Sequence, residues 1–271
     1  MEILNYIGIK IGPFSIGNFT LGPWLVGFYG IAIVFGVTIA CMLGSCIVKM
    51  QKLNIYDFIV CVAMSGLGII IGAKLLYFIT IWDEIDFSRF SEAAYRNMFI
   101  NGGFVYYGGF FGWLAIIPIV RYALKIDIWT YIENCFPCAV VAHGFGRIGC
   151  FLGGCCYGIE YDGPFAMTYY GSLAAPDGVS LFPVQMLESL CLFALAGFLF
   201  WYRFKHKGKQ RILVMYAFTY APLRFLLEFL RGDSARGRLL FFSTSQWCSI
   251  VILLVAVIFV IVSSKKDVDG K

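Results

Sequence analysis

Long runs of apolar residues, separated by short clusters of charge, make up most of this chain of 271 residues. A helix needs about 20 consecutive apolar residues to cross the hydrocarbon core of a membrane, within a range of about 17–25. Breaking the chain at its charge clusters therefore predicts seven membrane-spanning helices. The predicted spans are Trp24–Val48, Phe58–Trp82, Phe104–Val120, Ile132–Leu152, Val184–Tyr202, Ile212–Leu230 and Gln246–Val262.

Two of these spans depart from a regular pattern. The span Phe104–Val120 is short for a complete crossing. The span Ile132–Leu152 carries His143, Arg147 and several glycines, which favours a broken or re-entrant helix. Irregular backbone inside a membrane is tolerated where protein or a wet cavity surrounds it.

Composition restricts the class of protein further. Apolar residues make up 60% of the chain and charged residues only 14%, against about 25% in an average soluble domain. Such a chain cannot solvate its surface as a soluble globule, a coiled coil or a disordered segment. Long continuous runs also exclude a membrane barrel, whose strands alternate. The net charge of +5 includes no long basic cluster, so we expect no nucleic-acid partner. We predict an all-α polytopic membrane protein with a single domain over residues 1–271.

The distribution of lysine and arginine predicts the orientation. Twelve of these residues fall in the loops after the first, third and fifth spans and at the C-terminus, and six fall on the opposite side. Because basic loops stay in the cytoplasm, we expect an outer N-terminus and a cytoplasmic C-terminus. No cleaved signal peptide is expected at the N-terminus. The two sizeable extramembrane segments, at about 83–101 and 157–182, then lie on the outer side.

A few charged residues remain inside the predicted spans: Lys74, Arg147, Arg224, Glu188 and Glu228. A charge at the centre of a bilayer costs about 2.5–3.5 kcal/mol on insertion scales, so each needs a partner, a route to the surface or a function. Arg224 and Glu228 have the i, i+4 spacing of an ion pair, and Lys74 has a stem long enough to reach the surface. Arg147 lies among glycines, and its planar guanidinium suits a phosphate. Two arginines from different spans indicate a site for an anionic lipid head group.

The segment around Arg147 resembles the signature of a known family. Residues 146–158 read GRIGCFLGGCCYG, and the signature of the bacterial prolipoprotein diacylglyceryl transferase family reads roughly G-R-x-G-N-F-x-N-x-E-x-x-G. Five further segments follow in the family's order and cover nearly the whole chain. They are FYG at 28–30, GAKL at 72–75, YYGG at 106–109, FPVQMLE at 182–188 and RFLLEFLR at 224–231.

This resemblance implies an activity. Members of the family move a diacylglyceryl group from phosphatidylglycerol to the lipobox cysteine of a prolipoprotein. The reaction forms a thioether and releases glycerol phosphate at a site that opens to the outer leaflet of the bacterial plasma membrane. The resemblance makes Arg147 and Arg224 the catalytic arginines, and we expect no cofactor. The spacing of the cysteines argues against a metal site. The positions expected to contact substrate are Tyr29, Lys74, Gly108, Gly109, Cys150, Gly158, Gln185, Glu188 and Glu228.

Several signature positions carry other residues in this chain. Tyr107 and Phe182 stand where the family has histidines, Cys150 and Gly153 where it has asparagines, and Cys155 where it has a glutamate. The phosphate end of the site is therefore retained, while the acceptor end is altered. Two alternatives follow from these departures. One is a related enzyme that uses another acceptor or another phospholipid fragment, and the other is a non-catalytic lipid-binding or transport protein on the same scaffold.

The general base is left open by the sequence. Tyr107 occupies the position of the family's histidine, but a tyrosine is a poor base at neutral pH unless cations lower its pKa. His143 lies one helical turn before Arg147 and shares its helix face. It is either a relocated base or a neutral buried side chain.

Ten cysteines complete the candidate chemistry. Five of them lie in predicted spans and are interpreted as small apolar packing residues: Cys41, Cys46, Cys61, Cys191 and Cys248. Cys135 and Cys138 lack a second CxxC pair at zinc-site spacing. Cys155 and Cys156 follow the arginine-bearing span, where packing, a disulfide or a reactive thiol are all open.

Overall fold

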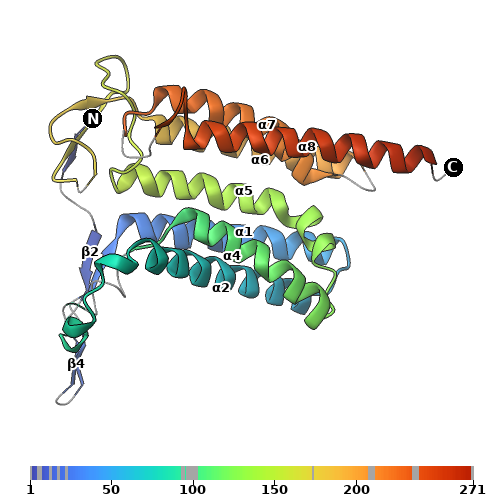
Figure 1. The fold of residues 1–271 in the computed structure, drawn as a ribbon, viewed down its shortest axis with the longest axis horizontal. Helices are drawn as coiled ribbons and strands as arrows, with labels where there is room; N and C mark the ends of the chain where they lie inside the picture. Colours follow the sequence, from blue (N-terminus) through green and yellow to red (C-terminus); the bar gives the residue numbers. More distant parts are fainter. Residues whose placement is uncertain are drawn as a thin grey trace. The chain divides into compact units, whose positions relative to one another are not determined.

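The computed structural model describes the whole chain except residues 1, 5–7, 12–13, 17–18, 22–23, 93–94, 96–102, 173, 207–210, 234–237 and 270–271. Its described part is mostly helical (Figure 1). The helices are α1 (Phe28–Met50), α2 (Ile55–Thr80), α4 (Tyr106–Pro118), α5 (Ile128–Leu152), α6 (Val184–Lys205), α7 (Ile212–Leu227) and α8 (Thr244–Asp269).

Six of the helices in this described part are long and apolar enough to cross a membrane. This confirms the predicted all-α polytopic membrane class. Helix α4 falls outside that set because it has only 13 residues. It ends at Pro118 and continues as a π-helical turn, Ile119–Ala123, so the third predicted span is indeed short.

Two details of the predicted spans are wrong. Trp24–Gly27 forms strand β5, so the first helix begins at Phe28. Apolar composition alone does not separate a short strand from the start of a helix. The fourth span is not broken, because α5 is one continuous helix that even includes Pro137. Its glycines are compatible with a regular helix once neighbouring helices pack against them.

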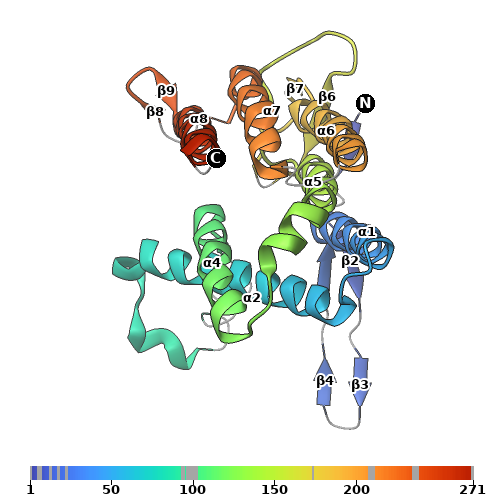
Figure 2. The ribbon, with the colours of Figure 1, turned by 90° about the vertical axis from the view of Figure 1, so that its right-hand side faces the viewer.

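The chain divides into two compact units, Met1–Gly44 with Cys135–Lys271, and Ser45–Asn134. The second unit contains α2, η1 (Trp82–Glu84), η2 (Phe87–Ser91), α4 and the π-helical turn. Helices α2 and α4 lie side by side in both views (Figures 1 and 2).

Glycines bring α2 and α4 into backbone contact. A Cβ atom at Gly112 would overlap the carbonyl oxygen of Gly68, and one at Gly72 would overlap that of Gly108. The pairs Gly68 with Gly72 and Gly108 with Gly112 each have the small-xxx-small spacing that lets membrane helices approach closely. This pair of helices is therefore held by shape and dispersion.

In the first unit, α7 packs between α6 and α8 (Figure 2). A fully buried apolar cluster joins α5, α6 and the start of α7. Its buried members are Val140, Leu192, Leu195, Ala196, Leu199 and Ile212. This cluster fixes the three helices whose polar faces meet further along.

Short strands cover one end of this unit. β1 (Glu2–Leu4) pairs with β6 (Met167–Tyr170), which pairs with β7 (Ser180–Leu181). The other strands form three two-stranded ribbons. These are β2 (Gly8–Ile11) with β5, β3 (Phe14–Ile16) with β4 (Phe19–Leu21), and β8 (Arg238–Leu239) with β9 (Phe242–Ser243).

Candidate functional site

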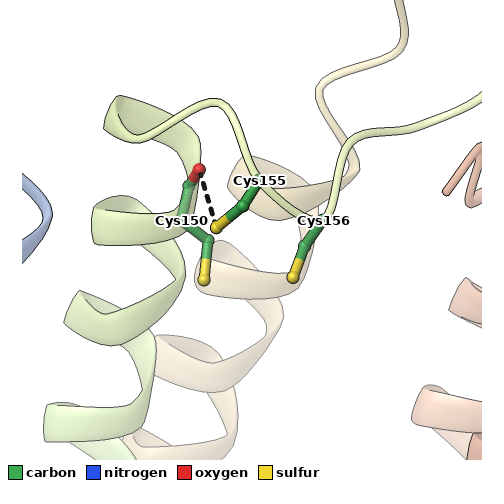
Figure 3. Close-up of side chains that lie close together, drawn as sticks. All are labelled: Cys150, Cys155 and Cys156. Atoms are coloured by element: carbon green, nitrogen blue, oxygen red, sulfur yellow. Dashed lines mark hydrogen bonds between the residues drawn. The ribbon is translucent and has the colours of Figure 1, made fainter. Parts of the chain in front are cut away.

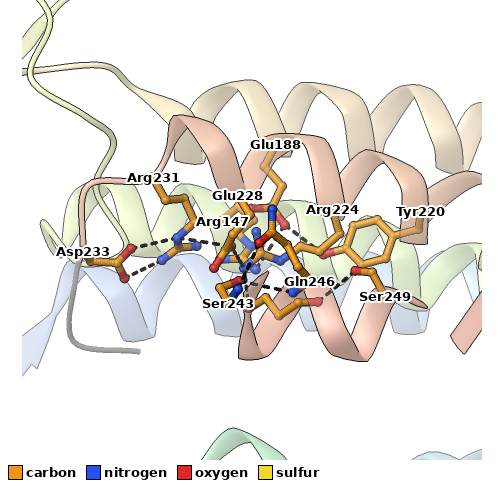
Figure 4. Close-up of polar contacts among 11 residues, drawn as sticks. Arg147, Glu188, Tyr220, Arg224, Glu228, Arg231, Asp233, Ser243, Gln246 and Ser249 are labelled. Carbon is orange, nitrogen blue, oxygen red and sulfur yellow. Dashed lines mark hydrogen bonds and ion pairs between the residues drawn. The ribbon is translucent and has the colours of Figure 1, made fainter. Parts of the chain in front are cut away.

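A cluster of buried charges lies where α5, α6 and α7 meet (Figure 4). The Arg147 guanidinium on α5 lies 3.1 Å from the Glu188 carboxylate on α6. Their side chains are only 13% and 2% exposed. A pair removed this far from solvent is strong only with good geometry and further hydrogen bonds. The two residues are 41 positions apart, so only the fold brings them together.

Tyr220 on α7 supplies such a hydrogen bond. Its hydroxyl donates to the Glu188 carboxylate at 2.8 Å. Glu188 therefore accepts from Tyr220 and pairs with Arg147 at the same oxygen. This carboxylate links three helices.

A second ion pair lies on α7 and the turn after it. Arg224 Nη2 lies 2.7 Å from the Glu228 carboxylate, with both side chains less than a tenth exposed. The i, i+4 pair that the spacing indicated is therefore present. Arg224 Nη2 also donates to the Ser245 hydroxyl on α8 at 3.1 Å. Its other terminal nitrogen, Nη1, is a buried donor without a hydrogen-bond partner among the described residues.

Arg231 extends the cluster beyond the helix. Its guanidinium makes two hydrogen bonds to Asp233, at 2.8 and 2.6 Å, and lies 3.9 Å from Glu228. Burial opposes the charged form of Arg231. The hydrogen bonds from its guanidinium to Asp233 outweigh that effect and raise its pKa above the usual range. The side chains of Tyr220, Arg224, Glu228 and Arg231 thus follow one face of α7 and its extension at helical spacing.

The first turns of α8 close the cluster with neutral polar groups. Gln246 and Ser249 are buried. The backbone N–H of Ser243 donates to the Gln246 side-chain oxygen at 3.0 Å, and the Ser249 hydroxyl donates to the Ser245 carbonyl at 3.0 Å. These groups give the charged side chains a polar wall in place of lipid.

The segment after α5 holds the ends of these helices together. The Ile159 N–H donates to the Leu230 carbonyl at 3.0 Å, and the Phe182 N–H donates to the Ile159 carbonyl at 2.9 Å. A Cβ atom at Gly158 would overlap the Phe182 carbonyl oxygen, so only glycine fits there. We predicted a substrate contact for Gly158; what the structure gives it is a close backbone approach.

Gln185 has a comparable supporting position. Its side chain is 1% exposed and donates to the Cys155 carbonyl at 2.9 Å. Nearby, Tyr169 donates to the Phe151 carbonyl, and burial raises the pKa of the Tyr169 hydroxyl. Both side chains fix the turn that follows α5.

Three other predicted residues belong to this unit. Cys150 lies in the last turn of α5. The His143 ring lies 5.4 Å from the Tyr220 ring in an edge-to-face arrangement, beside the Arg147–Glu188 pair. Tyr29 lies in the first turn of α1 and packs against Gly149 of α5, where an added Cβ would come within 3.2 Å of the Tyr29 ring. Tyr29 keeps nearly half of its surface exposed.

The remaining predicted residues belong to the unit of α2 and α4. The Lys74 ammonium lies 4.6 Å from the centre of the Phe104 ring and 5.4 Å from that of Tyr77. Tyr107 is partly exposed and contacts the Tyr106 ring. Gly108 and Gly109 are buried in the contact with α2. Substrate contacts for these residues stay predictions.

Sequence reasoning missed four members of the cluster: Tyr220, Ser245, Gln246 and Asp233. A signal existed for Tyr220, which precedes Arg224 by four residues on the same helix face. Arg231 ends the segment RFLLEFLR at 224–231, but the sequence predicted no role for it in the site. Ser243 and Gln246 have the S-x-x-Q spacing of a capping box and make both of its hydrogen bonds, so a local signal for Gln246 existed. No local pattern pointed to Ser245, because its contact with Arg224 depends on how α8 packs on α7.

The fold and this cluster define a polytopic membrane protein with an arginine-rich, carboxylate-supported polar site. Comparison with known proteins identifies the family. Residues 17–262 match the family model described as prolipoprotein diacylglyceryl transferase, and the chain belongs to this family.

Named relatives agree with this assignment. Phosphatidylglycerol–prolipoprotein diacylglyceryl transferase 2 of Clostridium perfringens is 36% identical over 201 residues, which cover 74% of this chain and 75% of the relative. The phosphatidylglycerol–prolipoprotein diacylglyceryl transferase of Clostridium tetani is 35% identical over 234 residues, covering 84% and 90%. That of Leptospira interrogans is 28% identical over 243 residues, covering 72% and 76%.

Proposed function

We propose that this protein transfers a diacylglyceryl group from phosphatidylglycerol to the lipobox cysteine of a prolipoprotein. Family membership and the names of the relatives support the activity. The observation that carries the proposal for the site is the buried meeting of Arg147 and Arg224 from different helices. A chain with no anionic ligand to bind has little reason to bury two arginines there.

The reaction requires that a carbon–oxygen bond of the lipid break. The acceptor sulfur attacks the glyceryl carbon that bears the phosphate, and the bonding electrons leave with the phosphate oxygen. Glycerol phosphate departs, and the thiol proton passes to a base or to the leaving group. Preorganised cations in a water-poor site stabilise the charge that develops on that oxygen.

Arg224 is our first candidate for this role. Its Nη1 donor has no hydrogen-bond partner among the described residues, and a phosphate oxygen would satisfy it. Glu228 and Ser245 hold the other terminal nitrogen and so fix the guanidinium. Arg147, held by Glu188, is the second phosphate ligand in this proposal.

His143 is our candidate for the base. It shares the face of α5 with Arg147 and contacts Tyr220. A His143→Gln variant should lower turnover and shift the pH profile of the reaction. A structural role for His143 would leave the shape of that profile unchanged.

The orientation is also part of the proposal. The excess of lysine and arginine in alternate loops supports a cytoplasmic C-terminus, which would open the site to the outer leaflet of a bacterial plasma membrane. A reporter fused after Lys271 that works only in the cytoplasm should be active.

A second candidate function differs in the acceptor or in the phospholipid donor. Tyr107, Cys150, Gly153, Cys155 and Phe182 replace polar signature residues, which favours an altered acceptor or another anionic phospholipid as donor. The phosphate end of the site would then work as described.

One assay separates these candidates. The purified protein is incubated with phosphatidylglycerol labelled in its diacylglyceryl part and with a lipobox peptide. A labelled thioether peptide supports the main proposal. Release of glycerol phosphate without labelled peptide supports another acceptor. If neither product forms although the protein is folded in detergent or in vesicles, the proposal fails and a lipid-binding role is favoured.

A further inference from the structure

Three cysteine side chains converge at the C-terminal end of α5 (Figure 3). The sulfur atoms of Cys150, Cys155 and Cys156 all lie within 4.8 Å of one another. This is the one group of three or more potential metal-ligating side chains among the residues that the structure describes. All three side chains are partly buried, so an ion can reach them from outside.

The end of the helix explains the first two positions. The Cys155 N–H donates to the Cys150 carbonyl at 3.0 Å, and the Gly154 N–H donates to the Phe151 carbonyl at 3.2 Å. Gly154 has a φ of +66°. These are the hydrogen bonds of a Schellman cap, which places the side chains of Cys150 and Cys155 against each other. Gln185 holds the Cys155 carbonyl from α6.

A second left-handed residue brings in the third thiol. Cys156 itself has a φ of +58°, a conformation that costs a non-glycine residue free energy unless surrounding contacts stabilise it. The positive charge of the Arg231 guanidinium acts on the Cys156 thiol and favours its thiolate form. The turn is therefore held in a shape that turns three sulfurs toward one another.

This arrangement suits a thiophilic metal ion better than a disulfide. Zinc–sulfur bonds of about 2.3 Å place two sulfurs on a tetrahedral ion about 3.8 Å apart, which the observed spacing reaches with small side-chain rotations. A disulfide would use two of the thiols and leave the third without a role. Three thiolates with one divalent ion carry a net charge of −1, which the positive charge of Arg231 beside Cys156 partly balances.

We propose that Cys150, Cys155 and Cys156 form a three-thiolate binding site for a zinc-like ion, with a fourth position open to water or another ligand. Binding releases three thiol protons and forms three metal–sulfur bonds. This site departs from the absence of metal ligands that the sequence led us to expect.

Metal binding by the full-length protein in detergent tests this proposal. The reduced protein is titrated with Cd²⁺, and the thiolate-to-metal charge-transfer absorption is followed; Zn²⁺ then displaces Cd²⁺. We expect one ion per chain for the wild type. Cys150→Ser and Cys156→Ser should each weaken binding by about tenfold or more, since even changes around a metal ligand cost about 10–100-fold. Cys191→Ser, which alters a partly buried thiol on α6 outside the cluster, should bind like the wild type.

Thermal denaturation gives a second readout. Zn²⁺ should raise the midpoint of the wild type and of Cys191→Ser but not that of Cys156→Ser, because an ion that binds only the folded state stabilises it. Absence of saturable binding by the reduced wild type overturns the proposal even if a serine variant fails to fold. Equal loss of binding in Cys191→Ser also overturns it. A third outcome would also overturn it. If the protein purified without reductant has eight titratable thiols instead of ten, two cysteines form a disulfide. If reduction of that disulfide then restores no metal binding, the metal site does not exist.

Discussion

Helices α2 and α4 meet through glycines, whereas α5, α6, α7 and α8 meet through ion pairs and hydrogen bonds. In the first contact, backbones approach so closely that a single methyl group at Gly112 would overlap the Gly68 carbonyl. In the second, Glu188 alone joins a guanidinium from α5 and a hydroxyl from α7. Small residues give membrane helices close contact without any polar group to satisfy.

Charge is the more expensive way to hold helices together in a membrane. Each buried arginine and carboxylate loses hydration, and the ion pair recovers much of that loss only while every partner is present. A protein that needed only stability would do better with the glycine contact. The charged cluster of the first unit is therefore best explained by a ligand, and the difference between the two contacts can be tested.

The largest effect is expected from removing the carboxylate at the centre of the cluster. Glu188→Ala leaves Arg147 and Tyr220 without their common partner, so the free energy of unfolding should fall by about 3–5 kcal/mol. Unfolding in detergent by heat or by added denaturant measures this. Glu160→Ala removes an exposed carboxylate and should change little. If both variants unfolded like the wild type, the cluster would not hold the helices.

A smaller effect is expected from the glycine contact. Gly112→Ala inserts a methyl group against the α2 backbone and should cost about 1–3 kcal/mol through overpacking. Gly66→Ala is the matched control on α2, because a Cβ there would meet no atom within 4 Å. It should leave the midpoint unchanged or raise it slightly. If Gly112→Ala left the free energy of unfolding unchanged, the close contact between α2 and α4 would not contribute to stability.

The smallest effect is expected for an exposed ion pair. Arg121 lies 3.1 Å from Asp127, with side chains 42% and 61% exposed. Arg121→Ala should lower the free energy of unfolding by about 0.2–1 kcal/mol at most, and added salt should remove the difference. An effect as large as that of Glu188→Ala would mean that burial does not set the strength of these pairs.

Much of the fold follows from the sequence because apolar runs long enough to cross a membrane leave few alternatives. The failures have local causes. Trp24–Gly27 is apolar but extended, and periodicity does not separate these states in four residues. The glycines of α5 suggested a break, yet Gly149 serves to admit Tyr29.

The candidate site was predictable where its contacts are local. Arg224 and Glu228 share one helix face, so their spacing indicated the pair. The partner of Arg147 was not predictable from spacing, because Glu188 belongs to another helix. The convergence of Cys150 with Cys156 was also hidden, since it depends on a positive φ at a residue that rarely adopts one.

Turnover of an Arg224 variant tests the central claim most directly. Arg224→Ala removes a preorganised donor to the leaving phosphate, which should lower turnover with labelled phosphatidylglycerol and lipobox peptide by about 10²–10³-fold. Arg224→Lys keeps the charge without the planar fork and serves if the alanine variant is unstable; it should also lose most activity. Arg121→Ala should keep wild-type turnover. Wild-type turnover in a folded Arg224→Ala protein would contradict the account.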